Sequence, residues 1–249
     1  MDVLILAAGY GTRLYPLTIN KPKALLKVGQ KTILDHLMDK LDSISGVSNI
    51  CLTTNDKFFV PFKEWAKENP RKIKINVLND KTLSNDDRLG AIGDIKFSLD
   101  NADLSEDLLV LGSDNLFEFN LKDFVEFAIS KKPSVSFALF DIKDKEKASL
   151  YGIAEVKEGT SELLSFEEKP KQPKSTLAAT AIYFYPAEKL NLVTTYMSGG
   201  NTKDAPGNFI KWLIGKEKVY AYVFKEKWFD IGDKESLEKA DQEYKGKDN

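Results

Sequence analysis

The sequence is poor in cysteine and histidine, with one residue of each type among 249. A single cysteine, Cys51, cannot form a disulfide within the chain, and it excludes a metal cluster held by several thiolates. The one histidine, His36, lies in a segment whose apolar residues have helical spacing, so we expect a core or surface imidazole there and no catalytic base. The chemistry of this protein should therefore depend on other side chains.

Long apolar runs and a strong excess of one charge are also missing. The apolar residues 3–8 are too few for a signal peptide, have no basic leader and run straight into a glycine-rich turn. No segment approaches the ~20 apolar residues that a membrane helix needs. The 36 basic and 38 acidic residues give a net charge of -2, which argues against a nucleic-acid binder. We expect a cytoplasmic protein with no membrane or nucleic-acid partner, and the sequence leaves a homo-oligomer open.

Hydrophobic periodicity predicts alternating strands and helices through the first part of the chain. The predicted strands are residues 3–6, 50–53, 73–78, 108–112 and 134–142, and the predicted helices between them are residues 33–44, 57–69, 91–99 and 121–129. Phe58, Phe62 and Trp65 form an aromatic stripe that fits the core face of one of these helices. This alternation predicts an α/β fold whose mostly parallel central sheet is covered on both faces.

The pattern changes after residue 150, where antiparallel pairing is expected. Residues 152–156 and 163–167 flank a polar connection with Gly159, as a hairpin requires. Further strands are predicted at 178–185 and 219–224, and further helices at 208–214 and 234–244. No linker or repeat divides the chain, so we expect one domain over residues 1–249, with a nucleotide-binding half at about 1–115 and a second ligand-binding half at about 116–249.

A glycine-rich loop follows the first strand and has the composition of a phosphate site. Gly9 and Gly11 remove side chains where the backbone must turn and approach phosphate oxygens, and exposed N–H groups there can donate to anions. Arg13 can fork two hydrogen bonds onto a phosphate, and Lys23 adds a compact charge. These residues predict phosphoryl or nucleotidyl chemistry on a nucleoside triphosphate.

The two common nucleotide-binding glycine patterns do not fit this loop. Leu14 stands where a dinucleotide-binding fingerprint has its third glycine, and Pro16 interrupts the helix that would receive the pyrophosphate. No Gly-Lys-Ser or Gly-Lys-Thr occurs in the chain, so the P-loop pattern is absent as well.

Four ordered motifs instead resemble those of the sugar-1-phosphate nucleotidyltransferases. They are LAAGYGTRLYPLTINKPKALL at residues 6–26, LGSDN at 111–115, FEEKPKQPKS at 166–175 and WFDIGD at 228–233, and AIYFY at 181–185 adds to them. Within the group, the chain is most similar to glucose-1-phosphate thymidylyltransferases, along nearly its whole length. The resemblance implies a Rossmann-like, three-layer nucleotidyltransferase fold with an added antiparallel sugar-binding part.

The resemblance also implies the reaction and its site. A sugar-1-phosphate attacks a nucleoside triphosphate, most simply glucose-1-phosphate with dTTP or UTP, to give an NDP-sugar and pyrophosphate. Arg13 and Lys23 are the implied catalytic cations. The implied nucleotide-binding residues are Ala8, Gly9, Gly11, Thr12, Arg13, Asn79 and Asp80. The implied sugar-phosphate-binding residues are Gly152, Glu168, Lys169 and Thr180.

Two aspartates are the candidate ligands of a Mg²⁺ cofactor. Asp114 follows an apolar strand, and should therefore lie at the carboxyl end of that strand, where ligands bind in open α/β sheets. Asp230 follows a second apolar run. Carboxylates from separate strands can hold one Mg²⁺ while phosphate and water oxygens complete its octahedron. Taken singly, each aspartate is more typical of a helix or turn cap than of a metal ligand; the resemblance reverses this and favours the metal role.

The segment that should read the base departs from the thymidylyltransferase pattern. Leu78-Asn79-Asp80 and Arg88-Leu89-Gly90 stand where that group has a Gln-Pro turn and Gly-Leu-Ala-Gln-Ala, so uracil or cytosine could replace thymine. Two rival hypotheses remain. One is a cytidylyltransferase for phosphocholine or inositol phosphate, for which Trp212, Trp228 and the segment 183–185 are possible cage residues. The other is a non-catalytic nucleotide-sensing module, which would not require both aspartates.

Overall fold

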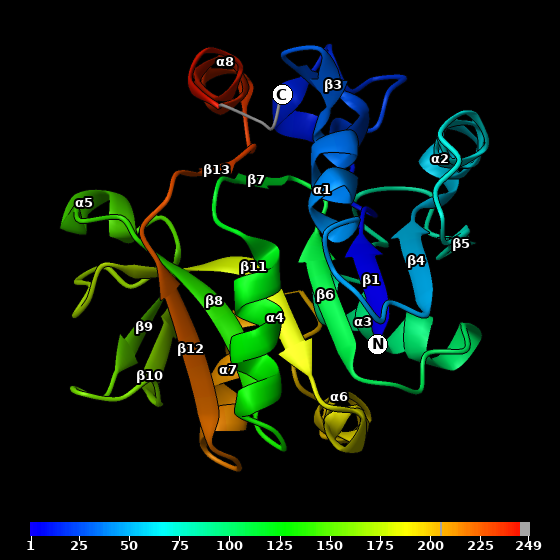
Figure 1. Cartoon of the computed structure of the whole chain (residues 1–249). Helices are drawn as coiled ribbons and strands as arrows, with labels where there is room; N and C mark the ends of the chain where they lie inside the picture. The colour runs from blue at the N-terminus through cyan, green and yellow to red at the C-terminus, as the bar shows by residue number, and fades with distance from the viewer. Residues whose placement is uncertain (205, 245–249) are drawn as a thin grey trace.

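A mixed sheet forms the centre of the protein (Figure 1), for which a computed structural model describes residues 1–204 and 206–244. Seven strands follow the order β10-β9-β11-β6-β1-β4-β5, and β8 branches from β11 and β12 pairs with β8. These strands are β1 (Asp2–Leu6), β4 (Asn49–Thr54), β5 (Ile75–Asn79), β6 (Leu108–Gly112), β8 (Val135–Asp141), β9 (Gly152–Val156), β10 (Leu163–Glu168), β11 (Leu177–Tyr185) and β12 (Val219–Phe224). Two small pairs lie outside this sheet, β2 (Lys27–Val28) with β3 (Lys31–Thr32) and β7 (Asn115–Phe117) with β13 (Trp228–Asp230).

Strand direction divides the central sheet into two parts. Strands β6, β1, β4 and β5 are parallel to one another. Strand β11 runs antiparallel to β6, β8 and β9, and β9 and β10 form the antiparallel hairpin predicted from the sequence. The carboxyl ends of the four parallel strands meet at one edge, which is where open α/β sheets bind their ligands.

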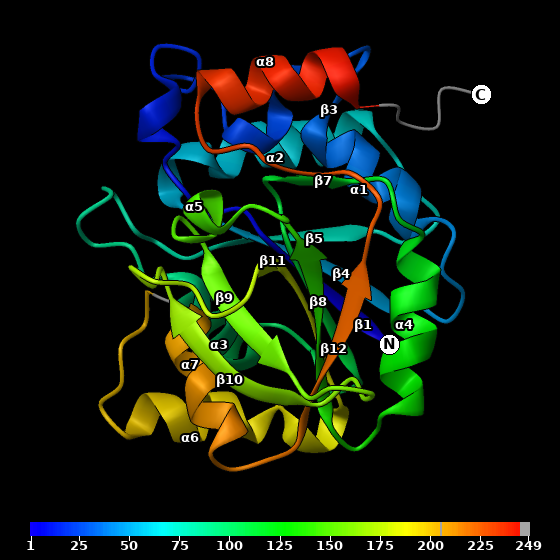
Figure 2. The ribbon, with the colours of Figure 1, turned by 90° about the vertical axis from the view of Figure 1, so that its left-hand side faces the viewer.

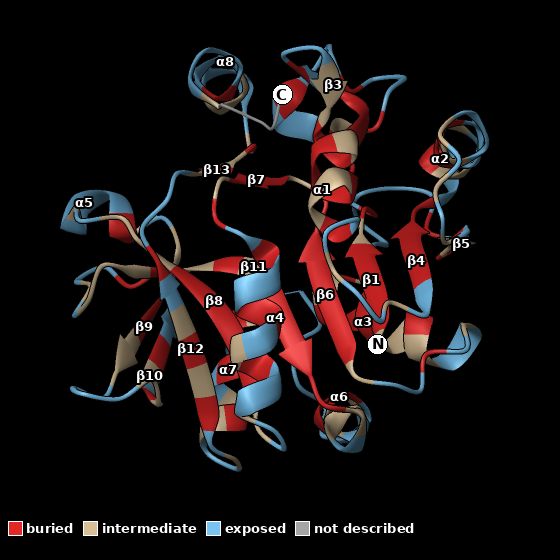
Figure 3. Cartoon of the chain, viewed as in Figure 1, coloured by how far each residue is buried: buried red, intermediate tan, exposed pale blue. Residues whose placement is uncertain are grey.

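Helices cover both faces of the sheet, as the alternation of strands and helices predicted. Val3 and Ile5 of β1 face one cluster of apolar side chains and Leu4 faces the other, because successive residues of a strand point to opposite faces. The first cluster includes α1 (Ile33–Leu41), α2 (Asp56–Glu68) and α4 (Leu121–Ser130), and the second includes α3 (Ala91–Asn101), α6 (Asn191–Ser198) and α7 (Pro206–Ile214). Figure 2 shows α4 on one side of the sheet and α3 and α7 on the other. The central strands are buried almost throughout (Figure 3).

A smaller apolar cluster lies beyond the carboxyl edge and joins segments from both ends of the chain. It packs Leu14 and Leu26 against Phe229, Ile231 and Ala240, the last of which belongs to α8 (Lys234–Glu243). Short 3-10 helices, η1 (Thr12–Leu14) and η2 (Lys23–Leu25), carry the N-terminal side of this cluster. The glycine-rich loop and β13 are thereby held over the same edge of the sheet.

The single histidine and the single cysteine both have structural roles. His36 Nε2 lies 2.9 Å from the carbonyl oxygen of Val28, and its ring meets Tyr244 edge to face, with the centroids 5.0 Å apart. Cys51 is buried in β4, and burial raises the pKa of its thiol to about 12. The imidazole of His36 is buried, which is one of the two environments, core or surface, expected from the sequence.

Most predicted elements are confirmed to within two or three residues, and β6, β9 and β12 have the predicted bounds. The aromatic stripe of α2 is buried as expected. The short elements were missed: β2, β3, β7, β13, α5 (Lys145–Ala148), α6, η1, η2 and η3 (Ala187–Lys189). No helix within residues 1–204 and 206–244 has the length and apolar content to cross a membrane.

Candidate active site

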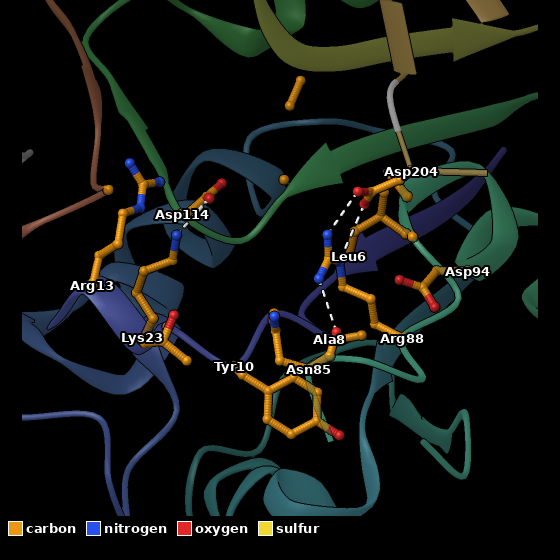
Figure 4. A pocket seen from close by; sticks show the side chains of 18 residues that line it. Leu6, Ala8, Tyr10, Arg13, Lys23, Asn85, Arg88, Asp94, Asp114 and Asp204 are labelled. Carbon is orange, nitrogen blue, oxygen red and sulfur yellow. Dashed lines mark hydrogen bonds and ion pairs between the residues drawn. The ribbon is translucent and has the colours of Figure 1, made fainter. Parts of the chain in front are cut away.

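A cleft of about 490 Å³ opens at the carboxyl edge of the parallel strands (Figure 4). It lies between the glycine-rich loop, the segment that leads into α3 and the end of β6. Its lining residues are Leu6, Ala8, Gly9, Tyr10, Gly11, Thr12, Arg13, Lys23, Asn85, Arg88, Gly90, Ala91, Asp94, Gly112, Asp114, Ala181, Asp204 and Gly232. All five predicted residues of the glycine-rich loop are among them, together with Lys23 and Asp114.

The glycine-rich loop is held in place by hydrogen bonds from neighbouring segments. Asn55 Nδ2 donates to the carbonyl oxygen of Ala8 at 2.8 Å, and Thr18 Oγ1 donates to that of Gly11 at 2.7 Å. Gly11 has φ +63°, a left-handed conformation that favours glycine, and a Cβ there would lie 3.2 Å from the Thr18 side chain. A Cβ on Gly9 would meet nothing within 4 Å. The loop is thus fixed at Gly11 and open at Gly9.

Lys23 and Asp114 form an ion pair on one wall of the cleft. Lys23 Nζ donates to Asp114 Oδ2 at 2.6 Å, with 16% of the lysine and 32% of the aspartate side chain exposed. Burial opposes ionisation of Asp114, but the ammonium outweighs it and lowers the pKa of this carboxyl. A lysine from η2 and a carboxylate that follows β6 therefore meet as opposite charges.

Asp114 is also oriented by a second hydrogen-bonded chain, which sequence reasoning missed. Asn115 Nδ2 donates to Asp114 Oδ1 at 2.8 Å, and Trp228 Nε1 donates to Asn115 Oδ1 at 2.7 Å. Trp228 precedes the predicted metal ligand Asp230 by two residues. The tryptophan thus fixes the amide that holds the aspartate, and its indole N–H has a partner.

Asp230 lies beside Asp114, across the short β7–β13 pair. It is the register partner of Asn115, and Ile231 N donates to the carbonyl oxygen of Asp114 at 3.0 Å. Burial and, after it, the negative charge of Asp114 raise the pKa of Asp230 to about 6. The two predicted metal-ligand carboxylates are therefore close enough for the charge of Asp114 to shift the pKa of Asp230.

Arg13 lies against the backbone at Gly232, just beyond β13. A Cβ on Gly232 would be 3.1 Å from one terminal nitrogen of the guanidinium and 3.3 Å from the other. Figure 4 shows the side chains of Arg13 and Lys23 extending toward the end of the cleft where Asp114 lies. The glycine leaves room for the arginine at this position.

Metal binding can be assessed from the donor set. Within the described residues, no three His, Cys, Asp or Glu side chains converge as a cation site. Asp114 and Asp230 supply carboxylate oxygens, the ligand type that Mg²⁺ prefers, and Mg²⁺ commonly takes one or two carboxylates with phosphate and water oxygens. A divalent cation bound between the two carboxylates would reduce their mutual repulsion. The pair fits a magnesium ion shared with a substrate, and does not fit a cation held by protein alone.

The opposite end of the cleft is bounded by an arginine–aspartate pair. Arg88 donates through Nε at 3.2 Å and through Nη2 at 2.7 Å to the two carboxylate oxygens of Asp204. Gly90 has φ +76°, and a Cβ there would lie 2.7 Å from the carbonyl oxygen of Lys203. The segment leading into α3 therefore packs closely against the chain at residues 203–204.

Two of the predicted nucleotide-binding residues are not in the lining of the cleft. Asn79 Nδ2 donates to Asp56 Oδ1 at 2.7 Å, and Asn79 Oδ1 accepts from Lys81 N. Asp80 is buried behind the cleft wall, where it interacts with Asp94. Asp94 lines the cleft, and it was missed because an acidic residue in the first turn of a helix is also typical of helix starts.

The predicted sugar-side residues lie at a separate position near β9, β10 and α7. A Cβ on Gly152 would lie 2.5 Å from the Phe166 ring and 3.1 Å from Glu168 Oε2, and one on Gly207 would lie 2.2 Å from the same oxygen. Glu168 is thus brought together with Gly152. Burial raises the pKa of Glu168, and the charge of Lys169 opposes that shift.

Lys169 is exposed at the surface, whereas Thr180 is buried. Lys169 is exposed, has φ +46° and lowers the pKa of Asp204 at the cleft rim, after the larger effects of Arg88 and burial. Thr180 is 1% exposed, and its hydroxyl donates to the carbonyl oxygen of Ala138 at 2.9 Å. This hydroxyl lies where β11 shifts register against β8, inside the sheet.

Comparison with known proteins gives matches over nearly the whole chain. Residues 2–247 match the nucleotidyl transferase family. A protein of Sulfolobus acidocaldarius assigned as a mannose-1-phosphate guanyltransferase is 30% identical over 236 residues, which cover 93% of this chain and 60% of that protein. The chain thus spans less than two thirds of the length of this curated relative.

Solved structures share the fold at lower identity. A glucose-1-phosphate thymidylyltransferase structure from Bacillus anthracis, in complex with a sucrose, aligns with a TM-score of 0.83 and 22% identity over 97% of this chain and 94% of that one. A UDP-glucose pyrophosphorylase complexed with UDP-glucose aligns with a TM-score of 0.81 and 21% identity over 98% and 97%. The Rossmann-like three-layer fold is thereby confirmed.

Proposed function

The chain belongs to the nucleotidyl transferase family, and from that premise we propose that it joins a nucleoside triphosphate to a sugar-1-phosphate and releases pyrophosphate. The observation that carries the proposal is the meeting of Lys23, Asp114 and Asp230 at one end of the cleft, beside the glycine-rich loop. Cations and a potential divalent-cation site beside an open loop suit a triphosphate.

The proposed reaction is a direct displacement at phosphorus. A phosphate oxygen of the sugar-1-phosphate forms a bond to the α-phosphorus, and the bond from that phosphorus to the bridging oxygen of the pyrophosphate breaks. A phosphate monoester dianion is already nucleophilic near neutral pH, so the protein needs to supply position and charge. Arg13 would bind the triphosphate, and Lys23 would follow the charge that develops at the reacting phosphate.

We propose Mg²⁺ as the cofactor, held by Asp114 and Asp230 together with phosphate oxygens. Bound there, it would neutralise charge on the triphosphate and polarise the reacting phosphorus. The residues of the chain prepare this position: Asn115 orients Asp114, and Trp228 holds Asn115. Lys23, which lies beside Asp114, would supply a cation to the phosphates at the same position.

The sugar-phosphate would enter from the side of β9 and β10. Lys169 stands at the rim shared with the cleft, where a cation lowers the repulsion between two phosphorylated substrates. Glu168 beside Gly152 offers a carboxylate that can accept from two adjacent sugar hydroxyls. Thr180 would contribute by holding the register shift of β11, because its hydroxyl is engaged inside the sheet.

The identity of the sugar and the base is a finer hypothesis. The motifs favour glucose-1-phosphate with dTTP or UTP, and a glucose-1-phosphate thymidylyltransferase is among the structures with this fold. Mannose-1-phosphate with GTP is a second candidate, because the 30% identical relative is assigned as a mannose-1-phosphate guanyltransferase.

Pyrophosphate release from a matrix of nucleoside triphosphates against sugar-1-phosphates, with Mg²⁺, tests the proposal. Turnover that needs both substrates supports it, and release with phosphocholine or inositol phosphate instead would favour the cytidylyltransferase alternative. An aromatic cage for choline would have to come from elsewhere, since Tyr10 is the one aromatic residue in the described cleft lining, and Trp212 packs on Phe209. Binding of a triphosphate without turnover of any acceptor would indicate the sensing module.

A further inference from the structure

Two carboxyl groups face each other under the α3 end of the cleft. Asp94 in the first turn of α3 and Asp80 just after β5 are each 6% exposed. Neither Asp80 Oδ2 nor Asp94 Oδ1 receives an N–H or O–H donor from the part of the chain that the structure describes, and both atoms are buried. The two side chains interact with each other, and each shifts the pKa of the other. An ionised carboxylate only accepts, so a hydrogen bond between them requires one shared proton.

The surroundings of the pair place that proton on Asp94. Asp80 Oδ1 accepts from Thr82 N at 2.7 Å and from Thr82 Oγ1 at 2.8 Å, which stabilises a charge on Asp80. Asp94 receives no such side-chain or backbone donor among the described residues. Burial, and then the charge of Asp80, raise the pKa of Asp94 to about 8. The neutral form of Asp94 is therefore favoured up to about that pH, and the Thr82 donors favour the charge on Asp80.

The position of Asp94 in the cleft separates it from the phosphate end. Figure 4 shows Asp94 on the side of Arg88 and Asp204, across the cleft from Arg13, Lys23 and Asp114. In the proposed function the triphosphate lies at the end of the cleft formed by Arg13, Lys23 and Asp114. A nucleotide laid along the cleft would then bring its base or ribose to Asp94.

We propose, resting on the proposed function above, that Asp94 reads the nucleobase and that the Asp80–Asp94 pair selects a base with an amino group on its Watson–Crick edge, guanine before the others. Asp94 lines the cleft, and with one of its carboxyl oxygens taken up by the shared proton, the other is left to accept from a ligand, with the charge of Asp80 behind it. Guanine presents two adjacent donors, N1–H and the 2-amino group. Uracil and thymine present one N–H between two carbonyl oxygens, and those oxygens would face the acidic pair without a donor.

Equilibrium binding separates this inference from the question of turnover. Calorimetry on the full chain with Mg²⁺ and no sugar-phosphate would compare GTP with ITP, which lacks only the 2-amino group, and with UTP and dTTP. We expect GTP to bind about tenfold more tightly than each of the other three, the effect of one good hydrogen bond. Asp94→Ala should bring GTP to within about threefold of ITP, whereas the shape-conserving Asp94→Asn, whose amide can donate to Asp80 while its oxygen still accepts from the base, should keep the preference for GTP. Asp100→Ala, on the exposed far end of the same helix, is the matched control and should change nothing.

The outcomes separate the two proposals. Equal affinity of the wild type for GTP, ITP, UTP and dTTP would overturn base selection, even if pyrophosphate release shows the enzyme to be active. An equal loss of affinity for all four in Asp94→Ala would also overturn it, because it would place the ribose at Asp94. A GTP preference that depends on Asp94 in a protein without turnover would leave base reading in place and remove the transferase proposal.

Discussion

Lys23 Nζ lies 2.6 Å from Asp114 Oδ2, which joins residues 91 positions apart across the candidate site. The pair keeps the carboxylate ionised and turned into the cleft. Asp114 would thus be ready to hold Mg²⁺, and Lys23 would stand beside it as a cation for the triphosphate. Both residues were singled out from separate motifs, and the structure adds their contact.

Replacing either metal-site carboxylate should abolish most turnover without unfolding the protein. Asp114→Asn and Asp230→Asn keep the shape of the side chain but remove the charge that would hold Mg²⁺. We expect pyrophosphate release to fall on the order of a hundredfold or more, with an unchanged circular dichroism spectrum. Asp123→Asn on the exposed face of α4 is the control. Full activity of a folded Asp114→Asn protein would refute the metal assignment.

Lys169→Ala should weaken the use of the phosphorylated acceptor. Removing the cation from the rim shared by the two substrates should raise KM for the sugar-phosphate about tenfold, with a smaller effect on the triphosphate. Steady-state kinetics with each substrate varied in turn measures this split, and Lys171→Ala serves as the comparison. If KM for the triphosphate alone increased, the two substrate positions would be reversed.

Gly232→Ala should act through Arg13. The added methyl group would lie 3.1 Å from the guanidinium, closer than carbon and nitrogen normally pack, so the arginine would have to move away from the phosphate end. We expect activity to drop about tenfold while stability changes little. Gly215→Ala, which gains only an ordinary contact with the Trp212 carbonyl oxygen at 3.4 Å, should keep wild-type activity. Equal activity of the two variants would show that Arg13 does not depend on this glycine.

Asp94→Asn should stabilise the protein at alkaline pH. The folded-state pKa of Asp94, about 8, lies above its ordinary value of 3.8, so the folded state binds more protons between these values. The free energy of unfolding of the wild type should therefore decrease as pH rises through this window, from a full contribution below about pH 4 to its loss above about pH 8. The amide does not titrate and can donate to Asp80. Urea unfolding at about pH 5.5 and pH 8.5 should give the variant its larger advantage at the higher pH, and the opposite trend would contradict the shared proton.

The sheet and its main helices were predictable because they follow simple periodicity. Strand β6 is apolar at every position before its glycine, and α2 carries its aromatic stripe at helical spacing, so local sequence was sufficient. The three residues of β13 exist as a strand only through pairing with β7. Such pairing depends on segments more than a hundred residues apart, and no local pattern reveals it.

The residues of the candidate site could be predicted where they belong to a sequence motif. They could not be predicted where their position depends on tertiary packing. Lys23 and Asp114 were found from motifs, whereas Asn79 was assigned to the nucleotide by position in the chain and instead contacts Asp56. No sequence pattern marked Asp94 as a site residue, because its environment results from its burial next to Asp80 in the folded chain. Thr180 looked available to a ligand, but the register shift of β11 turns its hydroxyl into the sheet.

A crystal structure with Mg²⁺, a non-hydrolysable triphosphate analogue and a sugar-1-phosphate tests the central claim most directly. The account predicts one Mg²⁺ bound by Asp114 and Asp230, Arg13 and Lys23 on the triphosphate, and the sugar-phosphate oxygen in line with the α-phosphorus. A triphosphate bound elsewhere, with these four side chains turned away from it, would contradict the account.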